Sequence, residues 1–131
     1  MRLVIRAVVA LAMLMACAAV GRAEAGKFGE LSIDDVAKKT GDKKVYVFDC
    51  NPREEWAEGH VPGAKWVDFS QVKPGDLPSD KKAMLVFYCN GWPECKKSHD
   101  ASAKAVEWGY QNVFWLREGI PAWQAKGYPV E

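Results

Sequence analysis

Cys89 and Cys95 are the residues of this chain whose side chains and spacing best suit a chemical reaction, because both are thiols and both lie in one loop region. Cys89 follows the apolar run 84–88, which is typical of a buried strand. A polar loop comes next, and a helical pattern begins near Ser98. Where a strand end faces the N-terminus of a helix, backbone N–H groups converge and favour an anion. This position indicates that Cys89 can ionise to the reactive thiolate.

The loop after Cys89 contains the residues expected to contact a substrate. They are Asn90, Gly91, Trp92, Lys96, Lys97 and Ser98. A free thiol has a pKa near 8.5, so only about 3% of it is thiolate at neutral pH. Amides of the loop and the ammonium group of Lys96 or Lys97 would raise that fraction. The same donors could hold an anionic substrate while Cys89 attacks it.

Cys95 places a second thiol in the same loop, six residues after Cys89. It could act as a resolving thiol that attacks a sulfur-loaded Cys89 and leaves a Cys89–Cys95 disulfide, which an outside reductant would then reset. The sequence is equally compatible with a structural disulfide, or with a Cys95 that takes no part in chemistry. Asp49, Glu55 and His60 also resemble a catalytic cluster in composition.

The N-terminal segment predicts export. Arg2 and Arg6 precede the apolar stretch 7–20 and the small-x-small sequence Ala23-Glu24-Ala25, a pattern typical of a secretory signal. We therefore predict a signal peptide at 1–25 and one domain at 26–131. Leu14-Met15-Ala16-Cys17 also resembles a bacterial lipobox, which leaves lipoprotein anchoring through Cys17 as an alternative. Either way the expected location is the periplasm or another site of export.

The remaining chain has the size and charge of one globular domain. It has 106 residues (131 − 25), with 15 basic (18 − 3) and 16 acidic (17 − 1) side chains. No run of like charge is longer than a lysine pair. We therefore expect no nucleic-acid partner, no transmembrane segment after removal of the signal, and a monomer.

Cys50, Cys89 and Cys95 are the cysteines of this domain. An odd number of cysteines in an exported protein leaves at least one thiol unpaired or paired between molecules. That composition favours a chemical over a purely structural use of cysteine. Cys50 comes at the end of another apolar run and is interpreted as a packed core thiol.

Predicted strands and helices alternate along the chain. Strands are expected at 45–48, 64–67, 84–89 and 113–116, and helices from Ser32 to near Thr40 and at 53–58, 98–108 and 120–126. This order predicts an α/β domain with a mostly parallel central sheet and helices on both faces. Ligands of such sheets bind beyond the carboxyl ends of the strands, where Cys89 is placed.

Three separated segments resemble the signatures of the rhodanese-like domain family. The matching residues are Asp49, Glu55-Trp56 and Gly59-His60-Val61-Pro62-Gly63-Ala64 near the start, Tyr88-Cys89 in the middle, and Gly109-Tyr110, Leu116-Arg117-Glu118-Gly119 and Ala122-Trp123 near the end. The resemblance implies a rhodanese-like fold and a sulfurtransferase that needs neither metal nor cofactor. Cys89 would take a sulfane sulfur from thiosulfate or a similar small anion, hold it as a persulfide, and pass it to a thiol or to cyanide. Asp49 and His60 would be a structural signature that joins loops by hydrogen bonds.

The chain departs from the family pattern at two places. The common active loop ends in an arginine just before the helix, whereas this loop is longer and has no arginine. The second departure is Asn51, which stands where the family often has an arginine, and Arg53 is the nearest substitute. Two alternatives therefore remain open: a thiol–disulfide redox protein that uses Cys89 and Cys95, and a non-catalytic binding module. A phosphatase or arsenate reductase is disfavoured, because Cys95 occupies the position of their oxyanion-binding arginine.

Overall fold

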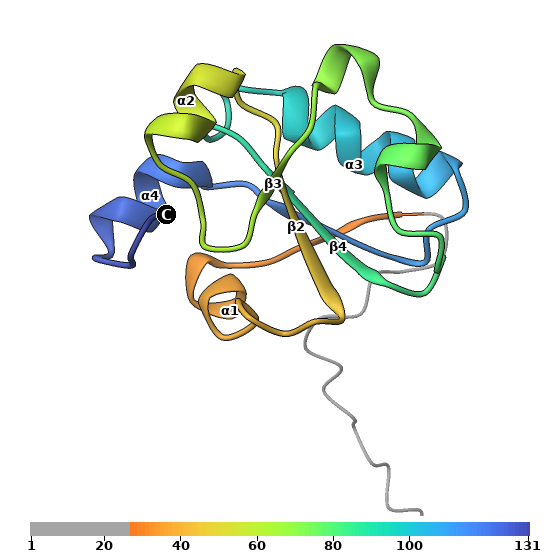
Figure 1. Ribbon diagram of the computed structural model, residues 1–131, viewed down its shortest axis with the longest axis horizontal. Helices are drawn as coiled ribbons and strands as arrows, with labels where there is room; N and C mark the ends of the chain where they lie inside the picture. Colours follow the sequence, from red (N-terminus) through yellow and green to blue (C-terminus); the bar gives the residue numbers. More distant parts are fainter. Residues whose placement is uncertain (1–26) are drawn as a thin grey trace, which may run out of the picture.

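The computed structural model describes residues 27–131 (Figure 1). The predicted signal peptide and the alternative acylation at Cys17 lie outside the described residues. In the described part of the chain, no helix is both long and apolar enough to cross a bilayer.

A five-stranded parallel sheet forms the centre of the domain, in the order β1-β5-β4-β2-β3. The strands are β1 Gly29–Glu30, β2 Val45–Asp49, β3 Lys65–Trp66, β4 Met84–Tyr88 and β5 Asn112–Leu116. The inner strands β4 and β5 are buried along almost their whole length, which explains their continuous apolar sequences. The predicted α/β architecture with a parallel sheet is confirmed.

Helices cover both faces of this sheet (Figure 1). They are α1 Ile33–Ala37, α2 Arg53–Glu58, α3 Lys97–Glu107 and α4 Gly119–Ala125, with short 3-10 turns at Phe69–Gln71 and Pro74–Asp76. On one face, α1 and α4 bury Ile33, Val36 and Trp123. On the other face, α3 packs Ala101 and Ala105 against the sheet. Helices α1, α3 and α4 therefore each bury residues on one side, as surface helices of an α/β domain do, whereas α2 has no buried residue.

The first helix begins at the residue that the sequence predicts. Ser32 Oγ accepts a hydrogen bond from the Asp35 amide at 3.1 Å, and Asp35 Oδ2 accepts one from the Ser32 amide at 3.3 Å. This reciprocal pair satisfies two N–H groups that a helix start leaves without a partner. The helix ends at Ala37, earlier than expected, because the next residues turn towards Gly41, whose φ is +87°.

Strand β1 was not predicted. It has two residues, and its hydrogen bonds continue into Leu31, whose amide donates to Trp115 O at 3.1 Å. Two residues are too few to show the alternation that marks a strand in a sequence. The strand is defined by its pairing with β5, which comes much later in the chain, so it depends on tertiary structure.

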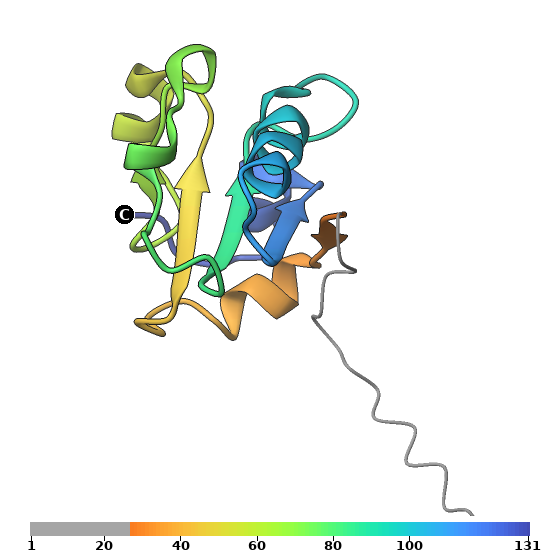
Figure 2. The same cartoon turned by 90° about the vertical axis from the view of Figure 1, so that its right-hand side faces the viewer.

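The carboxyl ends of the strands meet at one edge of the sheet. In Figure 2 the arrowheads of β2 (yellow), β4 (teal) and β5 (blue) point to this edge. The register aligns Asp49 at the end of β2 with Tyr88 at the end of β4. The loops that follow β2, β4 and β5 are therefore neighbours, and the one after β4 begins with Cys89.

Candidate active site

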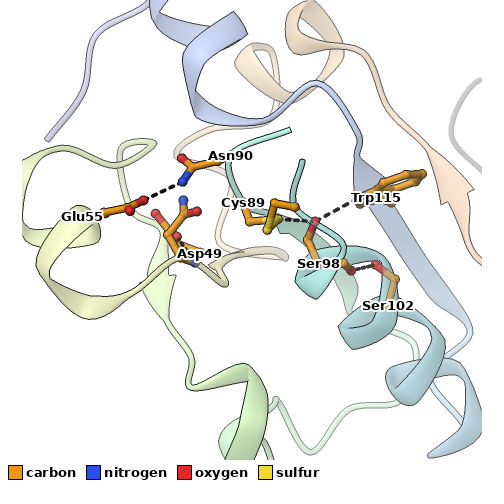
Figure 3. The surroundings of a disulfide bond; sticks show 9 residues. Asp49, Glu55, Cys89, Asn90, Ser98, Ser102 and Trp115 are labelled. Carbon is orange, nitrogen blue, oxygen red and sulfur yellow. Dashed lines mark hydrogen bonds between the residues drawn. A yellow bond between two sulfur atoms is a disulfide. The ribbon is translucent and has the colours of Figure 1, made fainter. Parts of the chain in front are cut away.

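The two predicted catalytic cysteines are joined by a disulfide (Figure 3). Cys89 comes directly after β4 and is 1% exposed, packed on the α3 side of the sheet. Cys95 is partly exposed, and the two Cα atoms are 6.4 Å apart. The structure therefore holds the pair in its oxidised form.

Ser98, in the first turn of α3, is the hydrogen-bond partner of the buried sulfur. Its Oγ lies 3.1 Å from Cys89 Sγ and accepts a 2.9 Å hydrogen bond from Trp115 Nε1 (Figure 3). An indole N–H can only donate, and a disulfide sulfur has no proton to give. The hydroxyl of Ser98 must therefore direct its own proton to Cys89 Sγ.

Trp115 is a member of this site that sequence reasoning missed. The sequence predicts only a core residue there, and the indole is indeed buried. A signal was available, since alternation along β5 places Val113 and Trp115 on the same face, which is the face that α3 covers. A buried indole N–H usually has a hydrogen-bond partner, and Ser98 supplies it here.

Two amides of the loop donate to backbone oxygens rather than to the sulfur. The Trp92 amide donates to Arg117 O at 3.0 Å, and the Cys95 amide donates to Gly91 O at 2.9 Å. In the disulfide form these two donors stabilise the loop itself and its contact with the turn after β5. Among residues 27–131, the hydrogen bond to Cys89 Sγ comes from the Ser98 hydroxyl instead.

The two lysines expected beside the sulfur lie against other groups. Lys96 Nζ is 5.7 Å from the centre of the Trp92 ring. Lys97 and Cys50 line a cavity of about 190 Å³ between the end of β2 and the first 3-10 turn. Cys50 is a free thiol that is 2% exposed, and burial raises its pKa, which agrees with its interpretation as a packed core thiol.

Asn90 and Gly91 set the path of the loop. Asn90 Nδ2 donates a 2.6 Å hydrogen bond to Glu55 Oε2, which joins the loop to α2 (Figure 3). Gly91 has a φ of +100°, and a β-carbon there would come within 2.8 Å of Glu118 O. Trp92 is 37% exposed and meets the Trp115 ring edge-on, with centroids 5.5 Å apart.

Asp49 is part of a buried hydrogen-bond network, whereas His60 Nδ1 lies 2.7 Å from Trp56 O within its own segment of the chain. Buried Asp49 accepts hydrogen bonds from the Asn51 amide at 2.8 Å and from the Tyr88 hydroxyl at 2.7 Å, and Tyr88 in turn accepts one from the Val61 amide. His60 stacks on Trp56, with ring centroids 4.3 Å apart. Burial raises the pKa of Asp49, and the Tyr88 hydrogen bond opposes that rise.

Asn51 and Arg53, at one of the two places where the chain departs from the family pattern, both contact Trp66. Asn51 is buried, and its backbone carbonyl accepts a 2.8 Å hydrogen bond from Trp66 Nε1. Arg53 lies over the Trp66 ring at 5.6 Å. The site therefore relies on a hydroxyl at the sulfur, and the described residues hold no cluster of three or more His, Cys, Asp or Glu placed to bind a metal.

The comparison with known proteins assigns the family. Residues 32–126 match the model of the rhodanese-like domain, so this chain belongs to the rhodanese-like domain family. A sulfurtransferase of Allochromatium vinosum is 27% identical over 104 residues, which are 77% of this chain and 92% of that protein.

Solved structures show the same fold. The BH2092 protein of Bacillus halodurans has a TM-score of 0.70 at 24% identity, with 79% of this chain and 76% of that chain covered. The human single-domain sulfurtransferase TSTD1 has a TM-score of 0.62 at 22% identity, with 74% and 96% covered. At these identities the likeness shows the architecture alone.

Proposed function

We propose that the reduced protein is a sulfurtransferase that carries sulfane sulfur as a persulfide on Cys89. One observation carries the proposal: in a rhodanese-like chain, Cys89 Sγ lies at the carboxyl end of β4 with the Ser98 hydroxyl 3.1 Å away. The sulfurtransferase of Allochromatium vinosum, which aligns with most of this chain, supports the same reaction class. Ligand sites at this edge are typical of parallel sheets.

The proposed reaction has two steps. The Cys89 thiolate attacks the outer sulfur of thiosulfate or a similar donor, a new S–S bond forms, and sulfite leaves with the electron pair of the old one. A thiol or cyanide then attacks the outer sulfur of the persulfide and regenerates the Cys89 thiolate. This is covalent catalysis by an activated thiolate. The Ser98 hydroxyl donates to Cys89 Sγ, the atom that carries the negative charge before the first step and again after the second.

The disulfide makes reduction a condition of activity. With its sulfur bonded to Cys95, Cys89 has no thiolate to attack a donor. We therefore expect sulfur transfer only after a reductant has opened the Cys89–Cys95 bond. A persulfide on Cys89 that Cys95 attacks would expel sulfide and restore the disulfide, so Cys95 would limit the persulfide lifetime.

The test compares oxidised and reduced protein after incubation with thiosulfate. Mass spectrometry should find one added sulfur on Cys89 in the reduced protein alone, and cyanide should remove it as thiocyanate. Cys89→Ser should abolish both signals, while Cys95→Ser should keep the transfer and lengthen the persulfide lifetime. Turnover in Cys89→Ser would overturn the proposal. Unchanged values in Cys95→Ser would remove Cys95 from the mechanism.

A second candidate function is that of a thiol–disulfide redox protein, because Cys89 and Cys95 are bonded to each other. Titration in glutathione buffers of known potential would then give a reversible two-electron couple. That couple, together with the absence of cyanide-reactive sulfur after thiosulfate, would favour this function. Absence of both would leave a non-catalytic binding module.

We also propose export to the periplasm or a similar compartment, where the protein acts as a monomer. A disulfide between two loop cysteines supports an oxidising location. The mass of the protein isolated from cells distinguishes cleavage near residue 25 from acylation at Cys17. Sedimentation of the reduced and oxidised forms tests the monomer. Retention of the whole N-terminal segment in a cytoplasmic fraction would contradict export.

A further inference from the structure

The two sulfurs of the disulfide have different surroundings. Cys89 is almost fully buried behind α3, whereas Cys95 is partly exposed on the loop. Cys89 Sγ accepts a hydrogen bond from the Ser98 hydroxyl, and among residues 27–131 no hydrogen bond reaches Cys95 Sγ. A thiolate that approaches from solvent therefore reaches Cys95 first. Cys89 is the sulfur whose negative charge a hydrogen bond would stabilise.

We infer that the disulfide opens by attack at Cys95, with Cys89 as the leaving thiolate, and that Ser98 and Trp115 are the positioning residues that impose this direction. The attacking thiolate bonds to Cys95 Sγ, the Cys89–Cys95 bond breaks, and its electron pair stays on Cys89. A second thiol of a dithiol reductant then displaces Cys95, which completes a two-electron reduction. The reductant becomes a disulfide.

The hydrogen bonds explain why Cys89 leaves. Thiol–disulfide exchange is faster when the leaving thiol has the lower pKa. A hydroxyl that donates to the charged form lowers the pKa of a thiol. Ser98 is fixed in the donating orientation because its lone pair accepts the Trp115 N–H at 2.9 Å. Both side chains are buried, so water does not compete for these bonds.

Cys95 is flanked by two exposed residues of opposite charge, Glu94 and Lys96. Their charges offset each other for an anionic attacker. The greater exposure of Cys95 therefore decides which sulfur is attacked. Which sulfur is attacked and which one leaves does not depend on sulfur transfer. The experiments below can therefore refute this inference without refuting the proposed function.

The first experiment locates the mixed disulfide on the unmodified sequence. Oxidised protein is mixed with glutathione, quenched in acid, and cleaved after Glu94, which separates the peptide of Cys89 from that of Cys95. Peptide mass spectrometry should find glutathione on Cys95. Glutathione on Cys89 would overturn the inference. This experiment needs no variant, so it does not depend on any substitution being tolerated.

The second experiment tests Ser98 through the pKa of Cys89. In the Cys95→Ser background, ultraviolet absorbance of the thiolate against pH gives that pKa directly. Ser98→Ala should raise it by about one unit, a tenfold change in the proton equilibrium. Ser98→Thr should keep it, and Trp115→Phe should give a smaller rise because the hydroxyl can then turn away.

Ser102→Ala is the matched control for this series. Ser102 is a second buried serine on α3, and its hydroxyl donates a 2.8 Å hydrogen bond to Ser98 O rather than to a sulfur (Figure 3). Its removal should lower the melting temperature. It should not change the pKa of Cys89 or slow the reaction of glutathione with the disulfide. An unchanged pKa in folded Ser98→Ala, or an equal shift in Ser102→Ala, would overturn the role of Ser98.

Discussion

Gly119 packs directly against the carbonyl oxygen of Cys89. A β-carbon on Gly119 would overlap Cys89 O and the amide nitrogen of Gly91, and the residue has a φ of +71°. The neighbouring Ile120 amide donates a 3.0 Å hydrogen bond to the same Cys89 oxygen. The first residues of α4 therefore pack their backbone against the backbone at the start of the candidate active loop, at a distance that only glycine allows.

We expect Gly119→Ala to be among the most destabilising substitutions in the domain. Gly127→Ala is the control, because Gly127 has a similar φ of +81° and nothing within 4 Å of its added β-carbon. The control should lose about 1–2 kcal/mol from the left-handed backbone alone. Gly119→Ala should lose about 1–3 kcal/mol more from overpacking, as measured by urea denaturation. Equal losses would contradict the close contact with Cys89.

Tyr88→Phe should destabilise the protein without touching the sulfur. The lost hydroxyl donates to buried Asp49 Oδ2 and accepts from the Val61 amide, so its removal takes away the partner of that oxygen and of that amide. We expect a loss of about 2–4 kcal/mol in the free energy of unfolding. Tyr128→Phe is the control, since its hydroxyl donates to exposed Asp34, which water can solvate instead. A loss no larger than that of the control would argue against the network.

Asp49 should make stability depend on pH. Burial raises the pKa of its carboxyl above the ordinary value of 3.8, so the folded state binds this proton more tightly than the unfolded state does. The stability that this group contributes is therefore complete below pH 3.8 and is lost as the pH rises through the folded pKa. Asp49→Asn has no such proton.

Urea denaturation of wild type and Asp49→Asn between pH 3 and pH 7 isolates this effect, because the other titrating groups are common to both proteins. The stability of the wild type relative to the variant should decrease as the pH rises, by about 1.4 kcal/mol for each unit of pKa shift. A relative stability that increases with pH would show a lowered pKa instead.

Cys50 should resist alkylation in the native protein. Its thiol is buried at the end of β2, and burial raises its pKa, so it stays protonated near neutral pH. Native protein treated with iodoacetamide should remain unmodified at Cys50, and the same reagent in concentrated urea should modify it fully. Rapid native labelling of Cys50 would show that the cavity shared with Lys97 admits reagents to the sulfur.

Local patterns were sufficient to predict most of the fold. The apolar runs that became β2, β4 and β5, and the capping residues of α1, depend on neighbours in the chain, so they can be read without coordinates. The position of Cys89 at a strand end follows from the same reading. By contrast, β1 is recognised only through its pairing with the distant strand β5.

The chemistry around the sulfur depended on contacts between distant parts of the chain. The sequence alone determined a parallel α/β domain with a cysteine at the carboxyl end of a central strand and a second cysteine in the following loop. Only the tertiary structure decided that these two are bonded, that Trp115 orients Ser98 towards Cys89, and that the Trp92 and Cys95 amides donate to backbone oxygens. The physical reason is that a hydrogen bond is set by distance and direction in space, and residues 98 and 115 meet only after α3 and β5 have packed.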